Sequence, residues 1–337
     1  ASRLYQKDPG CLFLNCENKL WEPNRNDDVR KLYLNPDGTP QNSDIYTRDI
    51  IGEAFGFNVY KNFIDSMDTL VMNGVINKWK AFPYDWRYDQ IAVASEDIVL
   101  EEGKIYRIIE EIEKLAQTSE TGKIILITHS NGGLVGKALI SKLEEQGKAD
   151  LINKVIMVAT PQIGTPEALL GLLHGGQRGI LKGWLPNYET FRELGENMQS
   201  AYNLLPSRSY FNVVDTEVQP IIEFSTTTLA TNYLRNIYGN TVTSFDALRF
   251  FLTGEVGVRI EPSPENVDEP NVLDQQFLDR AEVDHTFFDY WTPPSRVEIV
   301  QIAGWGLDTL RGIRYEGQEK ASCNADLSVC SKVTVLD

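Results

Sequence analysis

The chain has 337 residues, of which 42% are hydrophobic, and this suffices for one large α/β domain with insertions or for two small domains. Its net charge is −16 and its sequence pI is about 4.7. That acidity argues against electrostatic binding of nucleic acid or of an anionic membrane surface. No stretch approaches the roughly 18 apolar residues of a transmembrane helix, so we expect no integral membrane segment.

The four cysteines lie as two close pairs, Cys11 with Cys16 and Cys323 with Cys330. Four cysteines allow three connectivities, and neither pair has histidines at metal-site spacing. We favour two local disulfides in an extracytoplasmic protein over free cytosolic thiols, and we expect no metal and no cofactor. The first residues contain no apolar signal-peptide core, which leaves open a signal peptide that has already been removed.

Residues 11–50 carry Asn, Asp, Pro and Gly around short apolar pieces, which indicates an ordered loop too long for a plain connection. The apolar spacing from Val59 to Val71 predicts a helix that ends at Gly74. The next segments are a predicted strand over Trp79 to Phe82 and a charged amphipathic helix from about Ser95 to Thr118.

The segment from Lys123 to Gly136 is the centre of the chain. Ile124 to Ile127 predicts a strand buried on both faces, and the apolar spacing after the glycines predicts a helix that continues to Gly147. A strand that turns into a helix through small-x-Ser-x-Gly is a nucleophile elbow, so Ser130 is the candidate nucleophile.

Each neighbour of Ser130 has a role in this interpretation. The backbone N–H of Asn131 is a candidate oxyanion donor, and Gly132 and Gly133 supply the small residues that an elbow needs. Thr128 stands where glycine is usual. The alternative is that Ser130 merely caps the helix, because serine is a favoured N-cap.

Val155 to Val158 is a further apolar run, and the alternation of strands and helices predicts a parallel sheet covered by helices on both faces. We expect an α/β core over residues 1–164 and an inserted cap over 165–290. Residues 291–337 are expected to return to the sheet through Val297 to Ala303 and then to form a small two-stranded excursion with the second cysteine pair.

Three motifs occur in a fixed order: Tyr84-Asp85-Trp86-Arg87, then Thr128-His129-Ser130-Asn131-Gly132-Gly133, then Ala159-Thr160-Pro161 with Gly164-Thr165-Pro166. Together they resemble the lecithin:cholesterol acyltransferase family of α/β-hydrolases, which move or hydrolyse lipid acyl groups. The segments Ser200 to Ser207 and Ile302 to Gly306 agree with this resemblance, which covers essentially the entire chain.

The resemblance implies an α/β-hydrolase fold and roles for particular residues. Tyr84, Asp85, Trp86 and Arg87 are interpreted as structural, because an acid and a base at a strand end more often pair than act on substrate. The loop around Leu20 and Trp21 occupies the place of a mobile lid that meets a lipid surface, although burial of Trp21 in the core is the alternative.

The resemblance also implies that triad residues are missing. The chain has three histidines: His129 matches a packing residue, His174 is interpreted as a surface residue, and His285 precedes the last strand, whereas the family's base follows it. The family's acid and second oxyanion donor correspond to positions beyond Asp337 and before Ala1. We therefore expect a hydrolase body trimmed at both ends, inactive by itself.

The predicted function is lipid acyl-ester hydrolysis or O-acyl transfer through an acyl-enzyme on Ser130, in a secreted or extracytoplasmic protein with transient lipid-surface contact. Two alternatives stay open. One is a catalytically silent hydrolase-fold binding domain, and the other is an esterase for non-lipid esters.

Overall fold

The computed structural model of the chain describes residues 2–7, 17–23, 25–54, 56–95, 97–99, 105–176, 187–215, 219–225, 229–254, 259–317 and 331–336. The chain divides into two compact units. The first comprises Ala1–Gln162 with Tyr290–Gly304, and the second comprises Ile163–Asp289 with Trp305–Asp337. The last segment of the chain, which we expected to return to the core sheet, is therefore shared between the two units.

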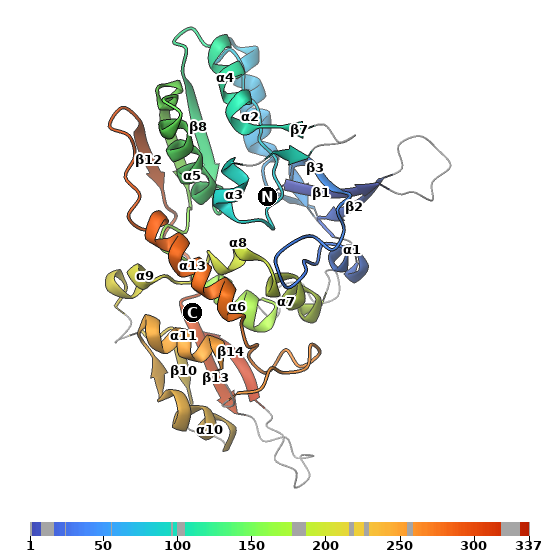
Figure 1. Cartoon of the computed structure of the whole chain (residues 1–337), viewed down its shortest axis with the longest axis vertical. Coiled ribbons are helices and arrows are strands. Elements are labelled where there is room, and N and C mark those ends of the chain that lie inside the picture. Colours follow the sequence, from blue (N-terminus) through green and yellow to red (C-terminus); the bar gives the residue numbers. More distant parts are fainter. Residues whose placement is uncertain are drawn as a thin grey trace. The chain divides into compact units, whose positions relative to one another are not determined.

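The first unit contains short antiparallel strand pairs, helices and one parallel sheet. Its strands are β1 (Ser2–Lys7), β2 (Glu17–Trp21), β3 (Ile45–Ile50), β4 (Glu53–Ala54), β5 (Phe57–Asn58), β6 (Ile98–Val99), β7 (Ile105–Tyr106), β8 (Ile124–His129), β9 (Ile152–Val158) and β12 (Glu298–Ile302). Its helices are α1 (Asn26–Arg30), α2 (Lys61–Met72), α3 (Gln90–Ser95), α4 (Ile108–Thr118) and α5 (Gly132–Glu145). Figure 1 shows α5 beside β8, on which it packs.

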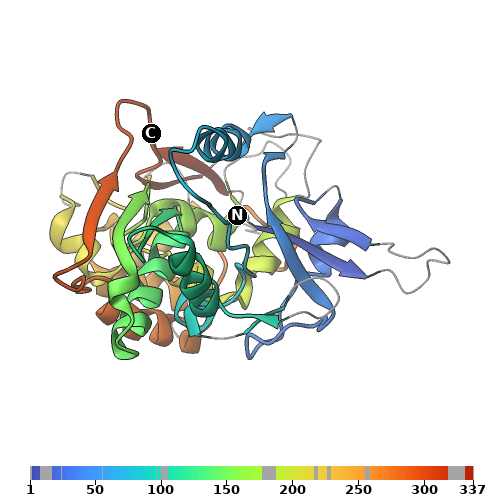
Figure 2. The ribbon, with the colours of Figure 1, turned by 90° about the horizontal axis from the view of Figure 1, so that it is seen from above.

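The parallel sheet has the order β12-β9-β8, so its three carboxyl ends lie at one edge. Figure 2 shows the orange strand β12 alongside the green strand β9. The order predicted from the sequence, strand then helix then strand, is present here because the apolar runs are β-branched and the segment between them has helical spacing. The parallel sheet of an α/β fold is thus confirmed.

One expectation about this sheet is wrong. Leu126 and Val155 are buried, but Ile125 and Ile127 remain 54% and 39% exposed, so β8 is not buried on both faces. The α5 helix covers the face of Leu126, since a methyl group on Gly136 would lie 3.8 Å from that side chain. Within the described ranges the opposite face is not fully covered.

Three local expectations are also corrected. Residues 11–50 were expected to form an ordered loop, but where the structure describes them β2 and β3 pair with β1 in an antiparallel sheet and α1 lies between them. Residues 79–82 form no strand. The expected helix from Ser95 begins only at Ile108, after the β6–β7 pair, and ends at Thr118 as predicted.

The second unit is built from helices around a four-stranded sheet. Its helices are α6 (Pro166–His174), α7 (Tyr188–Glu196), α8 (Gln199–Tyr202), α9 (Arg208–Val213), α10 (Leu229–Tyr238), α11 (Phe245–Thr253) and α13 (Gln275–Phe288). Its strands are β10 (Ile222–Phe224), β11 (Thr241–Val242), β13 (Gly312–Gly317) and β14 (Ser331–Leu336). An aromatic cluster of Phe224, Phe251 and Tyr315 forms the centre of its core.

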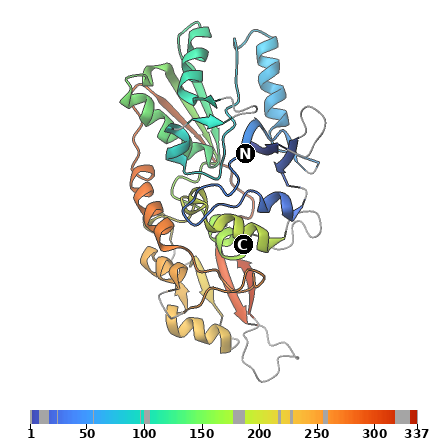
Figure 3. The ribbon, with the colours of Figure 1, turned by 45° about the vertical axis from the view of Figure 1, so that its right-hand side comes forward.

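Strands β13 and β14 form an antiparallel hairpin in the second unit. Strand β13 pairs in parallel with β10, and the sheet order is β11-β10-β13-β14. Figure 3 shows the two orange-red strands side by side, with the gold helix α10 packed on this sheet. Cys11, Cys16, Cys323 and Cys330 lie outside the described residues, so the disulfide pairing stays a prediction.

Two motifs that are distant in the sequence meet in the second unit. The N–H of Thr165 donates to the carbonyl of Leu204 at 2.8 Å, and that of Ser207 donates to Ile163 at 3.0 Å. Gly164 has a φ of 91°, and a methyl group there would lie 2.1 Å from the carbonyl oxygen of Leu205. Glycine is therefore required at this position by both backbone angle and space.

The one-sided cover of β8 predicts a sharp contrast between adjacent residues. Leu126→Ala leaves a cavity under α5 and should lower the free energy of unfolding by about 2–5 kcal/mol. Ile125→Ala, on the exposed face, should cost less than about 1 kcal/mol. Urea unfolding followed by tryptophan fluorescence measures both. Equal losses would show that the two faces are equally buried.

Candidate active site

Ser130 has the strained backbone expected of an elbow. Its φ is 53°, in the left-handed region that non-glycine residues rarely adopt and that typically costs on the order of 1–3 kcal/mol. Its N–H donates to the carbonyl of Val158 at 2.9 Å, and its own carbonyl accepts from Gly133 at 2.9 Å. The strain is thus held by β9 on one side and by the first turn of α5 on the other.

Small residues let α5 approach the strand ends closely. A methyl group on Gly133 would lie 2.0 Å from Thr160 Oγ1, so only glycine fits there. Thr128, which replaces the usual glycine before the serine, is accommodated differently. A methyl group on Gly136 would lie 3.0 Å from Thr128 Cγ2, so glycine at 136 leaves the room that threonine at 128 needs.

Asn131 provides an unused backbone donor beside the nucleophile. Within the described part of the chain, the N–H groups of Asn131 and Gly132 donate no hydrogen bond, as expected for the first turn of a helix. The Asn131 side chain accepts from Gln90 Nε2 at 2.6 Å, and Gln90 is fully buried. Sequence reasoning missed Gln90, because a polar residue opening a six-residue helix carries no local signal.

His129 contacts Tyr60. The Tyr60 hydroxyl and His129 Nδ1 are 2.7 Å apart, and the rings meet edge to face at 5.5 Å. Burial lowers the pKa of His129, so the ring is neutral at pH 7. The Ser130 hydroxyl has no hydrogen-bond partner among the residues that the structure describes. His129 thus shows a packing contact, without a hydrogen bond to the candidate nucleophile.

The Tyr84-Asp85-Trp86-Arg87 segment is fixed by its own polar contacts. Arg87 is 1% exposed; its Nε donates to Asp85 at 2.9 Å and one terminal nitrogen donates to the carbonyl of Leu32 at 2.9 Å. The Trp86 indole donates to the carbonyl of Ser2 at 3.2 Å. These contacts join the motif to the loop after α1 and to β1.

Trp21 ends β2 and packs on Trp86 with ring centroids 4.7 Å apart, whereas its neighbour Leu20 is fully buried. A lid that moves with Trp21 would have to break this aromatic contact and withdraw Leu20 from the core. The lid role of Trp21 therefore stays a prediction. Opening such a lid would require the loss of the Trp21–Trp86 contact and the exposure of Leu20.

The two other histidines lie in the second unit. His174 is 1% exposed and both ring nitrogens are engaged, by the Val267 carbonyl and the Tyr315 hydroxyl at 2.8 Å each. Its predicted surface position is wrong, because β13 brings Tyr315 over the end of α6, a non-local contact that no sequence spacing reveals.

His285 forms a buried pair with Asp289, whose carboxylate accepts from His285 Nδ1 at 2.9 Å and from Ser207 Oγ at 2.7 Å. Burial alone would raise the pKa of Asp289, but these hydrogen bonds outweigh it and lower that pKa below its ordinary value. The carboxylate separates the serine from the imidazole, so Ser207 has no base to activate it.

The sequence was compared with models of known protein families. A model of the lecithin:cholesterol acyltransferase family matches residues 53–335. The chain belongs to this family. Membership implies an α/β-hydrolase fold. The lecithin:cholesterol acyltransferase match spans the Tyr84, Ser130 and Thr160 segments and most of both units.

Other comparisons add little. The search of curated proteins found no match to the chain. The chain is similar to one in the crystal structure of the Tle4-Tli4 complex, with 14% identity and a TM-score of 0.39, over 75% of this chain and 53% of that chain. It therefore spans about half the length of that protein, and this likeness supports no functional statement.

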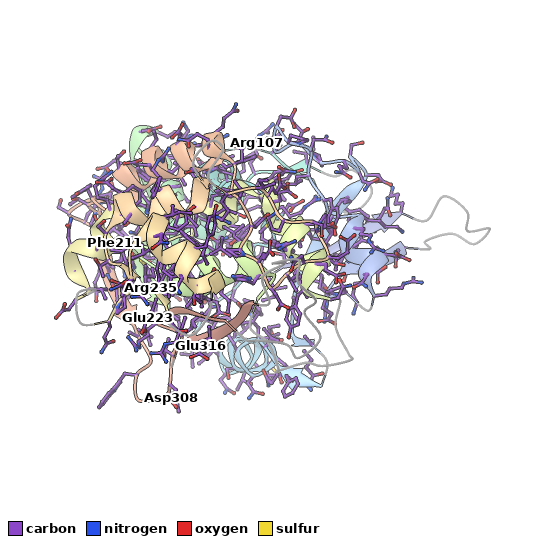
Figure 4. The ribbon with its side chains drawn as sticks, turned by 90° about the horizontal axis from the view of Figure 1, so that it is seen from below. Arg107, Phe211, Glu223, Arg235, Asp308 and Glu316 are labelled. Carbon is purple, nitrogen blue, oxygen red and sulfur yellow. The ribbon has the colours of Figure 1, made fainter. Side chains whose placement is uncertain are left out.

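No helix in the described ranges could span a membrane, and the same ranges contain no group of three or more potential metal-binding side chains. The second unit bears an open polar hollow of about 360 Å³. Glu223, Arg235 and Glu316 come from β10, α10 and β13 and line it (Figure 4). No histidine or cysteine is among the residues that line it.

The close approach at Gly133 predicts a position-specific effect. Gly133→Ala forces Thr160 or α5 to move and should lower the free energy of unfolding by about 1–3 kcal/mol. Gly132→Ala is the matched control, because its methyl group would meet nothing closer than 3.7 Å. Thermal and urea unfolding test the pair, and equal stability of the two variants would contradict the close approach.

The ion pair of Asp85 and Arg87 should contribute to stability. Arg87→Met leaves Asp85 without its cation and the Leu32 carbonyl without its donor, which should cost about 3 kcal/mol. Arg87→Lys keeps the positive charge but loses the planar guanidinium that binds two acceptors. Its free energy of unfolding should lie between those of the wild type and Arg87→Met. A double-mutant cycle with Asp85→Asn isolates the coupling, and a coupling of zero would exclude a stabilising pair.

Proposed function

We propose that the protein is a serine-dependent acyl hydrolase or O-acyltransferase that acts on a lipid ester through an acyl-enzyme on Ser130. The observation that carries this proposal is that a strained serine backbone and an unused backbone donor occur side by side at the turn from β8 to α5. Ser130 is held at a φ of 53°, and the next residue, Asn131, has an unused backbone N–H. A serine that only capped α5 would not need a strained backbone, since N-cap residues adopt ordinary extended angles.

The chemistry follows from these positions. Ser130 Oγ attacks the ester carbonyl carbon, the carbonyl electrons move to oxygen, and the hydroxyl proton passes to a base. The resulting oxyanion accepts a hydrogen bond from the Asn131 N–H and lies at the positive end of the α5 dipole. The intermediate collapses, the carbon–oxygen bond to the leaving alcohol breaks, and the base returns its proton to that oxygen. Water or another alcohol then attacks the acyl carbon, and the bond to Ser130 Oγ breaks as Oγ regains a proton.

The substrate class rests on family membership. We propose on the same basis that the substrate is a lipid ester and that the protein is secreted or extracytoplasmic. We also propose that the Trp21 region contacts a lipid surface transiently. Residues 165–290 are proposed to form a cap. A catalytically silent binding domain and an esterase for non-lipid esters are the competing functions, and covalent labelling addresses the first of them directly.

The test is labelling of the purified chain with a long-chain alkyl fluorophosphonate, followed by peptide mapping. The Ser130 hydroxyl has no hydrogen-bonded base in the described residues, so we expect slow labelling. Oxyanion donors and binding alone can leave a rate of about 10³–10⁴ over water, which makes Ser130 the preferred serine. Added imidazole supplies a base and should accelerate the reaction.

Two variants make the result specific. Ser130→Ala should lose the label, whereas Ser207→Ala should keep it, because Ser207 donates to Asp289 and lacks an activating imidazole. A chain that takes no label at Ser130, with or without imidazole, would support the silent binding domain instead. If labelling succeeds, vesicles of phosphatidylcholine compared with a soluble short-chain ester separate the lipid from the non-lipid substrate.

A further inference from the structure

The hydroxyl of Tyr84 lies beside the elbow. A methyl group placed on Gly132 would be 3.7 Å from the Tyr84 hydroxyl oxygen, which is the nearest heavy atom apart from the chain neighbours of Gly132 and the backbone of α5. Gly132 begins α5, two residues after Ser130. The space left by the missing side chain of Gly132 is therefore bordered by a phenol oxygen.

This hydroxyl is not used in the structure. In the ranges described, the Tyr84 hydroxyl makes no hydrogen bond, whereas the hydroxyls of Tyr46 and Tyr60 bond to Glu17 and His129. Partly buried phenol oxygens usually have a partner, and an unused one is a candidate for a ligand contact. The main chain of Tyr84 is held by a hydrogen bond, because its N–H donates to Ser2 Oγ at 2.9 Å.

The hydroxyl is chemically suited to donate. Burial, reinforced by the nearby Tyr60, raises the pKa of Tyr84 well above its ordinary value. The phenol therefore keeps its proton throughout the physiological range. It lies at the same helix terminus as the unused N–H groups of Asn131 and Gly132.

We propose that Tyr84 is a catalytic residue whose hydroxyl donates a hydrogen bond to the oxyanion formed on Ser130. This inference rests on the proposed function and changes the role of the Tyr84-Asp85-Trp86-Arg87 motif from purely structural to partly catalytic. The side-chain donor acts together with the Asn131 N–H, and the missing side chain at Gly132 leaves the substrate oxygen room between them.

The experiment compares rates of phosphonylation. In this reaction the Ser130 Oγ–P bond forms, the P–F bond breaks with loss of fluoride, and the hydroxyl proton passes to imidazole buffer. The phosphonyl oxygen stands in for the oxyanion. Tyr84→Phe removes only the hydroxyl and should slow labelling of Ser130 by about 100-fold. Tyr46→Phe is the matched control and should react at the wild-type rate.

The outcomes separate this inference from the proposed function. No label on wild-type Ser130 overturns both. Label on the wild type, with a Tyr84→Phe rate within twofold of it and an unchanged melting temperature, overturns the role of Tyr84 alone. A purely structural Tyr84 would instead lower the melting temperature of Tyr84→Phe without a matching loss of rate.

A second measurement does not depend on a variant. The crystal structure of the phosphonylated wild-type chain should place the Tyr84 hydroxyl about 2.5–3.0 Å from the phosphonyl oxygen. A separation beyond about 3.5 Å, or a phosphonyl oxygen bonded only to backbone N–H groups, would overturn the proposal even if Tyr84→Phe failed to fold.

Discussion

The close approach of α5 to the ends of β8 and β9 is the constraint on which the candidate site depends. Gly133 leaves no room for a side chain against Thr160, and the methyl of Thr128 occupies space that Gly136 vacates. This packing fixes the first turn of α5, and that turn holds Ser130 in the left-handed region through the Gly133 N–H. A larger side chain at Gly133 would act on the serine through the backbone, without touching a substrate.

The parts of the fold that could be predicted from the sequence are those encoded locally. The strand, turn and helix from Ile124 to Glu145 follow from a β-branched run, two glycines and helical spacing, all within one segment. The burial of both faces of β8 was mispredicted. An apolar run shows that both faces of a strand are apolar, but it does not show whether a helix packs on each face. The attachment of β13 to β10 was missed for the same reason, since pairing partners 91 residues apart leave no periodic signal.

The histidines show the same division between local and non-local information. The order of His285 in the chain argued against its being the base. The structure shows its Nδ1 bonded to Asp289, an orientation that a catalytic histidine also adopts, so the case against His285 rests on its place in the chain and on the absence of a hydrogen bond from Ser130 among the described residues. It could not be predicted that Ser207, capping α9, would share that carboxylate. The surroundings of His174 were mispredicted, because adjacent glycines suggested a surface turn whereas Tyr315 covers the ring.

The motif from Tyr84 to Arg87 has contacts that are local in the sequence and contacts to distant residues. Asp85 and Arg87 are two residues apart and can form a local ion pair, while the Leu32 carbonyl that Arg87 also binds is 55 residues away. The burial of Arg87 favours a pair that is retained in one geometry, since a buried guanidinium without its acceptors would be costly. A loop anchored in this way can carry a neighbouring side chain that is itself unpaired. Tyr84 is that side chain: its N–H is bonded to Ser2, it directly precedes the Asp85–Arg87 pair, and its hydroxyl, which makes no hydrogen bond to the described residues, borders Gly132 at the start of α5.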